Sequence, residues 1–156
     1  MEFPAAVITA AGGTFSTITC FRSGIEMAIQ NLQFGVIGAD RRGTVAKHAH
    51  RPDQGSKIVA CCDTNPDVEA KCREWYGGDV FFTSEYRELL DRDLDGVFVC
   101  TPDFLHEEMA VEALRRGKAV FLEKPLAITV DGCDRILRAA KDHDAKLFVG
   151  HNMRFM

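Results

Sequence analysis

The sequence predicts an α/β fold in which six parallel strands form one doubly wound sheet in the order 3-2-1-4-5-6. Short apolar runs alternate with helical segments from residue 33 onward, a glycine turn follows the first run, and polar residues directly follow the later runs. Parallel strands are covered on both faces, so they read as short and nearly continuous apolar segments. The predicted strands are 33–37, 57–62, 79–83, 96–100, 119–122 and 146–149.

Length and composition indicate an ordinary soluble protein. The 156 residues are 46% hydrophobic and 27% charged, which suits one domain and is short for a two-domain enzyme. The net charge is −4 and the basic residues are spread along the chain, which argues against a nucleic-acid partner. No stretch approaches the roughly 20 apolar residues that a membrane helix needs, so we expect no membrane partner.

The cysteines do not have the spacing of a metal site, and we expect no metal. Three of them lie in apolar, strand-like runs, which indicates buried and reduced thiols in a cytoplasmic protein. The six cysteines are Cys20, Cys61, Cys62, Cys72, Cys100 and Cys133.

Residues 1–30 differ from the rest of the chain, with only three charged residues and no clear periodicity. A secretory signal would need a basic region before its apolar segment, and the sequence supplies Glu2 instead. We interpret residues 1–30 as a leader that is either disordered or an artefact of annotation or cloning. Met27 stands just before the first strand and could be the natural start, and the sequence leaves both readings open.

The stretch from Gln33 to Asp63 has the order of parts that binds a dinucleotide: strand, glycine turn, helix, strand and acid. Gly38 permits a tight turn off the strand, and Gly43 lets the helix pack close to the sheet. The helix N-terminus then offers N–H groups and a positive dipole end to a pyrophosphate. Asp63 follows about 20 residues later, where a carboxylate can accept both ribose hydroxyls. We therefore interpret 31–156 as a dinucleotide-binding domain.

One position departs from the G-x-G-x-x-G pattern, because its second glycine is Asp40. An anion there repels phosphate unless its side chain turns away or is neutralised. We expect Asp40 to point outward, with Arg41 or Arg42 offsetting its charge. Replacing Asp40 by glycine should then leave cofactor affinity unchanged or improve it.

Helix boundaries carry signals of their own. Pro66 marks a helix start, and Gly117 marks a helix end after two arginines. Thr129 precedes a helix whose apolar positions have helical spacing. These positions are Cys133, Ile136, Leu137 and Ala140.

Three loops turn polar directly after strands, where ligands bind in sheets of this kind. These loops are Thr101–His106, Glu123–Pro125 and Gly150–Phe155. Taken singly, residues of the first two have structural explanations: Thr101-Pro102 as a helix start, His106 as a surface helix residue, and Glu123-Lys124 as a solvated ion pair. Beside a cofactor, however, a lysine at a strand end would be partly desolvated. Lys124 could then orient or protonate a substrate oxygen, and it is our candidate catalytic residue.

In combination and in this order, the motifs resemble those of the Gfo/Idh/MocA oxidoreductases over about residues 33–156. The resemblance rests on five segments: Gly35-Val-Ile-Gly-Ala-Asp-Arg-Arg-Gly43, Cys62-Asp63, Thr101-Pro102 with His106, Glu123-Lys-Pro125 and Gly150-His-Asn-Met-Arg154. It implies a Rossmann domain that binds NAD or NADP. It also implies a cis peptide bond at Lys124–Pro125.

The resemblance assigns site residues as well. It implies that the pyrophosphate is cradled by Gly38, Ala39, Asp40, Arg41, Arg42 and Gly43. It implies that Asp63 holds the adenosine ribose and that Thr101, Pro102 and His106 line the cofactor cleft. Glu123 and Lys124 would approach the nicotinamide ribose, with Lys124 also reaching the substrate, while Asn152 and Arg154 would lie near the nicotinamide.

The function implied is hydride transfer to or from a sugar, cyclitol or related polyol. Family members continue into an antiparallel-sheet domain that binds the substrate, supplies a catalytic histidine and usually makes the oligomer; that domain is absent from this chain. We therefore expect a homo-oligomeric full-length parent, and a chain that binds cofactor but does not turn over substrate alone. An NAD-dependent glycosidase and a non-catalytic nucleotide-binding module remain alternatives.

Cofactor choice follows from the residues after the second strand. Asp63 is followed by Thr64 and Asn65, with no adjacent Arg or Lys to receive a 2′-phosphate. The carboxylate would repel that phosphate, so we expect NAD in preference to NADP.

Overall fold

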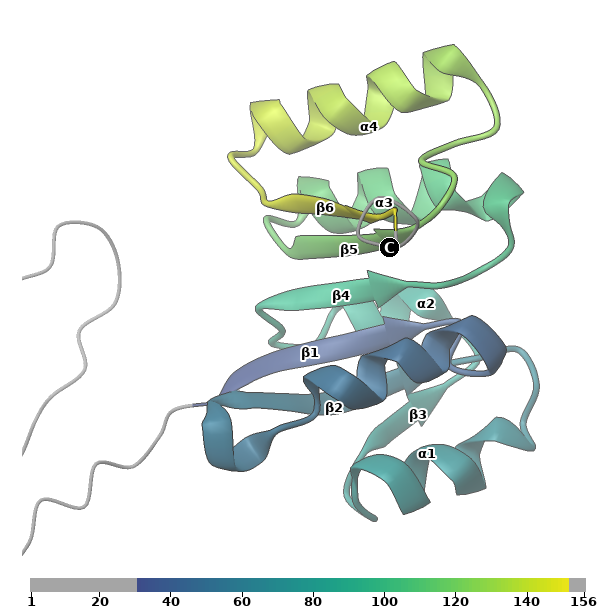
Figure 1. Ribbon diagram of the computed structural model, residues 1–156, viewed down its shortest axis with the longest axis vertical. Helices are drawn as coiled ribbons and strands as arrows, with labels where there is room; N and C mark the ends of the chain where they lie inside the picture. The colour runs from purple at the N-terminus through teal and green to yellow at the C-terminus, as the bar shows by residue number, and fades with distance from the viewer. Residues whose placement is uncertain (1–30, 152–156) are drawn as a thin grey trace, which may run out of the picture.

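The computed structural model describes residues 31–151, which form one six-stranded parallel sheet in the order β3-β2-β1-β4-β5-β6 (Figure 1). The predicted α/β class and strand order are confirmed. The strands are β1 (Leu32–Ile37), β2 (Ser56–Cys62), β3 (Phe81–Thr83), β4 (Gly96–Val99), β5 (Ala119–Glu123) and β6 (Leu147–Gly150). The α-helices are α1 (Val68–Tyr76), α2 (Tyr86–Leu90), α3 (His106–Arg115) and α4 (Val130–Asp142), and the 3₁₀ helices are η1 (Arg41–Ala49), η2 (Pro52–Gln54) and η3 (Asp103–Leu105). The expected leader lies outside the described residues.

The sheet buries side chains on both faces, as the apolar runs predicted. Val36 and Ile37 are neighbours in β1 and point to opposite faces, yet they are only 0% and 1% exposed. Val36 belongs to a core cluster with residues of η1 and α1, whereas Ile37 packs with residues of α2, α3 and α4. Two hydrophobic layers therefore hold the central strands from either side.

Two helix signals of the sequence are confirmed at the level of atoms. Thr129 caps α4, because its side-chain oxygen accepts a hydrogen bond of 3.0 Å from the Gly132 amide. Gly117 follows α3 with a φ of +71°, a left-handed conformation that glycine adopts without strain. Within α4, Ile136 is fully buried as expected, but Leu137 is 52% exposed.

Two boundaries differ by two residues from the sequence prediction, whereas the ends of the other predicted strands differ by at most one residue. Strand β3 begins at Phe81 rather than at residue 79, because the Val80 amide donates to the Gly77 carbonyl over 3.2 Å and closes a turn there. Helix α1 begins at Val68, and Pro66 lies in the turn before it, with its carbonyl accepting from the Glu69 amide. Both shifts are caused by local turns, which the pattern of apolar residues does not encode.

An aromatic ladder crosses the sheet on the face that also carries η1 and α1. It consists of Phe34, Phe98, Phe121 and Phe148, with successive ring centroids 5.9, 5.2 and 5.5 Å apart. These rings help to line a shallow cavity of about 210 Å³. Phe148 is 54% exposed, and Figure 1 shows no described helix in front of β5 and β6 on this side.

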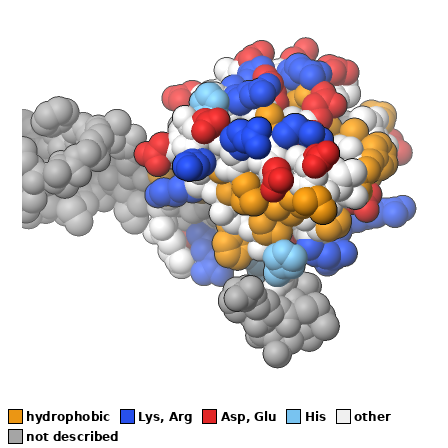
Figure 2. All heavy atoms as spheres, turned by 90° about the horizontal axis from the view of Figure 1, so that it is seen from above, with side chains coloured by type: hydrophobic (Ala, Val, Ile, Leu, Met, Phe, Trp, Pro, Cys, Tyr) orange, Lys and Arg blue, Asp and Glu red, His pale blue; other side chains and the backbone are white. Residues whose placement is uncertain are grey.

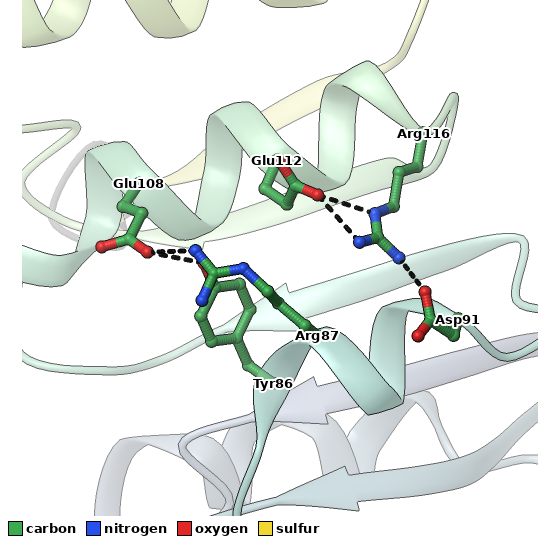
Figure 3. A network of polar contacts seen from close by, with 6 residues as sticks. All are labelled: Tyr86, Arg87, Asp91, Glu108, Glu112 and Arg116. Atoms are coloured by element: carbon green, nitrogen blue, oxygen red, sulfur yellow. Dashed lines mark hydrogen bonds and ion pairs between the residues drawn. The ribbon is translucent and has the colours of Figure 1, made fainter.

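Polar contacts join α2 to α3 (Figure 3). The Glu108 carboxylate accepts a hydrogen bond from the Tyr86 hydroxyl and another from Arg87, each over 2.7 Å. Arg116 bridges Glu112 and Asp91. These pairs are largely exposed, so each contributes only about 0.2–1 kcal/mol. Figure 2, seen from the α4 side, shows basic and acidic side chains interspersed over that surface beside a group of hydrophobic ones.

Candidate cofactor site

The loop between β1 and η1 leaves no room for side chains at its two glycines. Gly38 has a φ of +80°, and a Cβ there would lie 2.9 Å from the Cys100 carbonyl oxygen. A Cβ at Gly43 would lie 2.0 Å from the Gly38 carbonyl oxygen. The tight turn at Gly38 and the close packing at Gly43 are therefore confirmed, while their contact with a pyrophosphate stays a prediction.

Helix η1 starts at Arg41, immediately after this turn, with Asp40 at the N-cap position. The Asp40 side chain does not cap the helix, and the Gly43 amide donates to the Asp40 carbonyl over 2.7 Å. The first N–H groups of a helix have no partner within the helix, and its N-terminus carries partial positive charge. Together with the bare glycine backbone, this end of η1 can receive an anionic phosphate group.

Asp63 lies against the glycine loop from the end of β2. Its Oδ2 accepts a hydrogen bond of 3.1 Å from the Asp40 amide, and its Oδ1 accepts one of 3.0 Å from the Asn65 amide. Each carboxylate oxygen has two acceptor positions, so both can still accept hydroxyl groups. The two backbone contacts fix the orientation in which the carboxylate would meet a ribose.

The structure corrects the expected partner of Asp40. Its Oδ1 lies 3.2 Å from Nζ of Lys71, on α1, so the carboxylate is directed toward that helix. The pKa of Asp40 is lowered by the backbone amide of Arg41, then by the hydrogen bond from Lys71, with a smaller effect of the Arg41 charge. Arg42, the other expected partner, faces Glu123 instead, with Nη2 3.7 Å from Oε2. Sequence reasoning missed Lys71 because 31 residues separate it from Asp40.

The loop after β4 meets the glycine loop. The Thr101 amide nitrogen lies 3.0 Å from the position that a Gly38 Cβ would occupy. Thr101 Oγ1 is a buried hydroxyl oxygen for which residues 31–151 supply no hydrogen-bond partner. Buried polar atoms are nearly always paired, so this hydroxyl fits a ligand group bound beside the glycine turn. Pro102 follows it and is exposed.

His106 differs from its expected place in the cleft lining. Its side chain is only 1% exposed, and both ring nitrogens face backbone carbonyl oxygens. Nδ1 lies 2.8 Å from the Pro125 oxygen, and Nε2 lies 2.9 Å from the Thr101 oxygen. The buried ring therefore joins the loop after β4 to the loop after β5, rather than facing a ligand.

The loop after β5 presents Lys124 to solvent. Glu123 is 8% exposed, and its Oε2 accepts a hydrogen bond of 3.2 Å from the Lys124 amide. The Lys124 side chain is exposed, and the peptide bond between Lys124 and Pro125 is cis, as the resemblance implied. Asn152 and Arg154 lie outside the described residues, so their expected roles stay predictions.

The donor set at this edge suits a dinucleotide. The carboxyl ends of β1, β2 and β4 bring together a bare glycine turn, a helix N-terminus, a ribose-type carboxylate and a hydroxyl that has no partner within residues 31–151. Among residues 31–151 there is no group of His, Cys, Asp or Glu side chains that could hold a metal ion. The described cysteines form no disulfide, and only Cys133 is not fully buried.

Comparison with known proteins identifies relatives of this chain. A family model described as an oxidoreductase family with an NAD-binding Rossmann fold matches residues 32–151. The inositol 2-dehydrogenase/D-chiro-inositol 3-dehydrogenase of Shouchella clausii is 38% identical over 129 residues, which cover 80% of this chain and 37% of that protein. No described helix has the length and apolar character needed to cross a membrane.

Solved structures share the fold. Biliverdin reductase of Synechocystis, in complex with biliverdin and NADP⁺, has a TM-score of 0.73 and 26% identity over 80% of this chain and 39% of its own. The WlbA dehydrogenase of Bordetella pertussis, in complex with NADH and UDP-GlcNAcA, has a TM-score of 0.66 and 27% identity over 77% of this chain and 37% of its own. This chain thus spans little more than a third of the length of these relatives. Because the family model covers most of the sequence, the chain belongs to the Gfo/Idh/MocA oxidoreductase family, and its residues 32–151 match the NAD-binding Rossmann domain of that family.

Proposed function

We propose that this chain is the cofactor-binding part of an NAD(P)-dependent oxidoreductase that transfers hydride to or from a sugar, cyclitol or related polyol. One observation carries the proposal: the glycine turn is packed so closely that neither Gly38 nor Gly43 can bear a side chain. A Cβ at Gly38 would meet the backbone after β4, and a Cβ at Gly43 would meet the Gly38 carbonyl. Such a turn lets a pyrophosphate approach the backbone. The Shouchella clausii relative, named for its action on inositols, supports the substrate class.

Each end of the cofactor has its own residues in this proposal. The amides at the start of η1 hold the pyrophosphate, and Asp63 accepts hydrogen bonds from the adenosine ribose. The Thr101 hydroxyl and Glu123 lie toward the nicotinamide ribose. Asn152 and Arg154 are proposed to contribute near the nicotinamide. When bound, the cofactor supplies the hydride acceptor or donor, and the chain supplies position.

Lys124 is the proposed catalytic residue. It is exposed at the carboxyl end of β5, on a loop that His106 ties to the loop after β4. Its ammonium can donate to a substrate oxygen and stabilise negative charge as hydride leaves or arrives. A backbone held by these contacts and an exposed ammonium suit a group that must meet a substrate from solvent.

NAD is the proposed preferred cofactor. The Asp63 carboxylate meets the adenosine ribose, where a 2′-phosphate would bring a second negative charge. NADP⁺ is bound in the structurally similar biliverdin reductase of Synechocystis. The proposed preference for NAD over NADP therefore rests on the Asp63 carboxylate and on the charged groups around it.

Substrate binding and assembly concern the whole enzyme. We propose that the parent is a homo-oligomer of the cytoplasm and that substrate contacts come largely from a region beyond the Rossmann domain. Hydride transfer needs reacting atoms held at near-attack distance, which can be worth roughly 7–11 kcal/mol of barrier. The chain alone should accordingly bind cofactor without enzyme-like turnover.

Calorimetric titration of the purified chain with NAD⁺ tests the proposal. Asp63→Ala should weaken binding at least about tenfold, because the ribose hydroxyls lose their acceptor. Asp67→Ala is the matched control: Asp67 is exposed, lies four residues later and makes no side-chain cap contact, so affinity should not change. Failure of the unaltered chain to bind either NAD⁺ or NADP⁺ would refute the proposed function.

A second measurement addresses the reaction. The full-length parent should form NADH from at least one member of a panel of inositols and sugar alcohols, and Lys124→Ala should reduce kcat by about 100-fold or more. Enzyme-like NADH formation by the isolated chain, abolished by Lys124→Ala, would show instead that the active site is complete within these 156 residues.

A further inference from the structure

We propose that the ion pair between Asp40 and Lys71 sets the choice between NAD and NADP, a proposal that rests on the function proposed above. Asp40 engages an ammonium group that would otherwise be available to a 2′-phosphate. The NAD preference would then depend on two acids with different tasks. Asp63 binds the ribose, and Asp40 occupies Lys71.

The geometry places these three residues around one point. The Asp40 amide donates to Asp63 Oδ2 over 3.1 Å, while Asp40 Oδ1 lies 3.2 Å from Lys71 Nζ. Asp40 therefore touches the proposed ribose acceptor with its backbone and the lysine with its side chain. A 2′-phosphate belongs to the same ribose that Asp63 would hold, so it would enter within reach of a lysine side chain from α1.

Lys71 is available for such a contact. Its side chain is 48% exposed and that of Asp40 is 36% exposed, so the pair is a solvated contact that a competing phosphate dianion can displace. Arg73, also on α1, is already committed: it pairs with Glu69 over 2.7 Å and donates to the Gly78 carbonyl. Lys71 is thus the better-placed cation of this helix.

Arg41 is the other cation near this point, and the test must separate it from Lys71. It is exposed and follows Asp40 directly, with a φ of +43°. Its charge contributes less to the lowered pKa of Asp40 than the hydrogen bond from Lys71 does. Lys71 is therefore the cation that Asp40 principally holds.

In the dinucleotide pattern, position 40 is a glycine, which would place no carboxylate there. Replacing Asp40 by glycine removes the partner of Lys71 and also removes a negative charge beside the phosphates. Both changes favour NADP, but only the first one requires Lys71. A double-mutant comparison therefore isolates the contribution of the lysine.

The experiment measures Kd for NAD⁺ and for NADP⁺ by calorimetry, using the unaltered chain, Asp40→Gly, and Asp40→Gly combined with Lys71→Met. Asp40→Gly should bind NADP⁺ at least about tenfold more tightly than the unaltered chain does, with NAD⁺ affinity unchanged or slightly higher. Adding Lys71→Met should remove most of that gain. Asp40→Asn keeps the Cβ and should shift the ratio in the same direction, so the test survives if the glycine variant fails to fold.

Two controls match the double variant. Lys57 pairs with Asp79 over the same 3.2 Å and lies near the opposite end of β2, so Asp40→Gly with Lys57→Met should keep the NADP⁺ gain. Because Arg41 belongs to the expected cradle of the pyrophosphate that both cofactors share, Asp40→Gly with Arg41→Met is judged by the ratio of the two Kd values, which should keep most of the shift toward NADP⁺. Loss of the gain in the arginine variant, but not in the Lys71 variant, would overturn the assignment to Lys71.

The outcomes separate the two proposals. If the unaltered chain binds NAD⁺ but neither Asp40 variant changes the NADP⁺ to NAD⁺ ratio, the selectivity proposal is wrong and the proposed function stands. If the gain persists without Lys71, charge removal alone explains it and the proposal is again wrong. If the unaltered chain binds neither cofactor, both proposals fail.

Discussion

His106 Nδ1 lies 2.8 Å from the carbonyl oxygen of Pro125, so a side chain at the start of α3 holds the loop that carries Lys124. The other ring nitrogen lies 2.9 Å from the Thr101 oxygen. Carbonyl oxygens only accept, so the ring nitrogen that carries a proton donates to its partner, and the tautomer decides which of the two contacts that is. In either state the ring is a buried link between two of the loops proposed to meet the cofactor.

Replacing His106 by leucine should therefore destabilise the chain by about 1–3 kcal/mol, because two loops lose a buried polar partner. NAD⁺ affinity should fall too, since the loops after β4 and β5 are no longer tied together. Urea unfolding and calorimetry measure the two effects. His143→Leu is the control, because His143 is exposed beyond the end of α4. Equal behaviour of the two variants would show that the link has no energetic role.

Gly43→Ala should be among the most damaging single substitutions. Its added methyl group would lie 2.0 Å from the Gly38 carbonyl oxygen, so η1 must move away from the sheet. Such overpacking typically costs about 1–3 kcal/mol, and here it should also abolish NAD⁺ binding. Gly78→Ala has open space around its Cβ and no left-handed backbone, so thermal unfolding should change little. A stable, cofactor-binding Gly43→Ala variant would contradict the packing described above.

The buried thiols should resist alkylation while the chain is folded. Burial raises the pKa of Cys62 and of Cys100 from 9.0 to about 12, so at pH 8 their thiolate fraction falls by roughly 1,000-fold. Cys133 is only partly buried, so mass spectrometry after iodoacetamide treatment should find it labelled first among the cysteines of residues 31–151. Faster labelling of Cys62 than of Cys133 in the folded chain would contradict this order.

The same thiols should make the chain less stable in alkali. Above pH 9 the unfolded chain loses these protons while the folded chain keeps them, so the free energy of unfolding should fall as the pH rises from about 9 toward 12. The burial of Tyr86, whose pKa is raised to about 12, adds to the loss above pH 10. Urea unfolding between pH 8 and pH 10.5 measures the trend, and Cys100→Ala should flatten its onset. A free energy of unfolding that rises over this range would show that other groups dominate.

Phe148→Lys should reduce the binding of a hydrophobic dye and any self-association of the chain. Phe148 is 54% exposed at the end of the aromatic ladder, where apolar area is contiguous with Phe121. Phe104→Lys is the matched control, since Phe104 is 63% exposed but lies outside the ladder. Dye fluorescence and sedimentation velocity read the effect, and an equal response of both variants would contradict a role for the ladder.

The fold was largely predictable because its information is local. Strands β1, β2 and β4 are short apolar runs buried on both faces. Such runs can be recognised as strands from their own residues, whatever their position in the sheet. The start of β3 was missed because a backbone hydrogen bond between Val80 and Gly77 closes a turn, and apolar pattern carries no signal for that bond.

The site was only partly predictable, since its side chains meet across the fold. The spacing of Gly38 and Gly43 indicates a tight turn and close backbone packing, and both could be predicted from the sequence alone. The ion-pair partner of Asp40 comes from another helix, whereas the charge of the neighbouring Arg41 has a smaller effect on Asp40 and Arg42 faces Glu123. His106 looks like a surface helix residue because burial at a helix N-terminus depends on loops that lie far along the chain.

The position of β1 at the centre of the sheet determines the order in which its neighbouring strands can pair with it during synthesis. Strand β1 pairs with β2 on one side and with β4 on the other, where Phe34 lies opposite Gly96. Until β4 has been synthesised, β1 therefore has a neighbour on one side only. The nascent chain can assemble the half-sheet β3-β2-β1 with η1 and α1, leaving a bare edge that only β4 completes. Long-range pairing of this kind is slow, and an open strand edge invites wrong partners. We therefore expect chaperone dependence to peak before β4 leaves the exit tunnel.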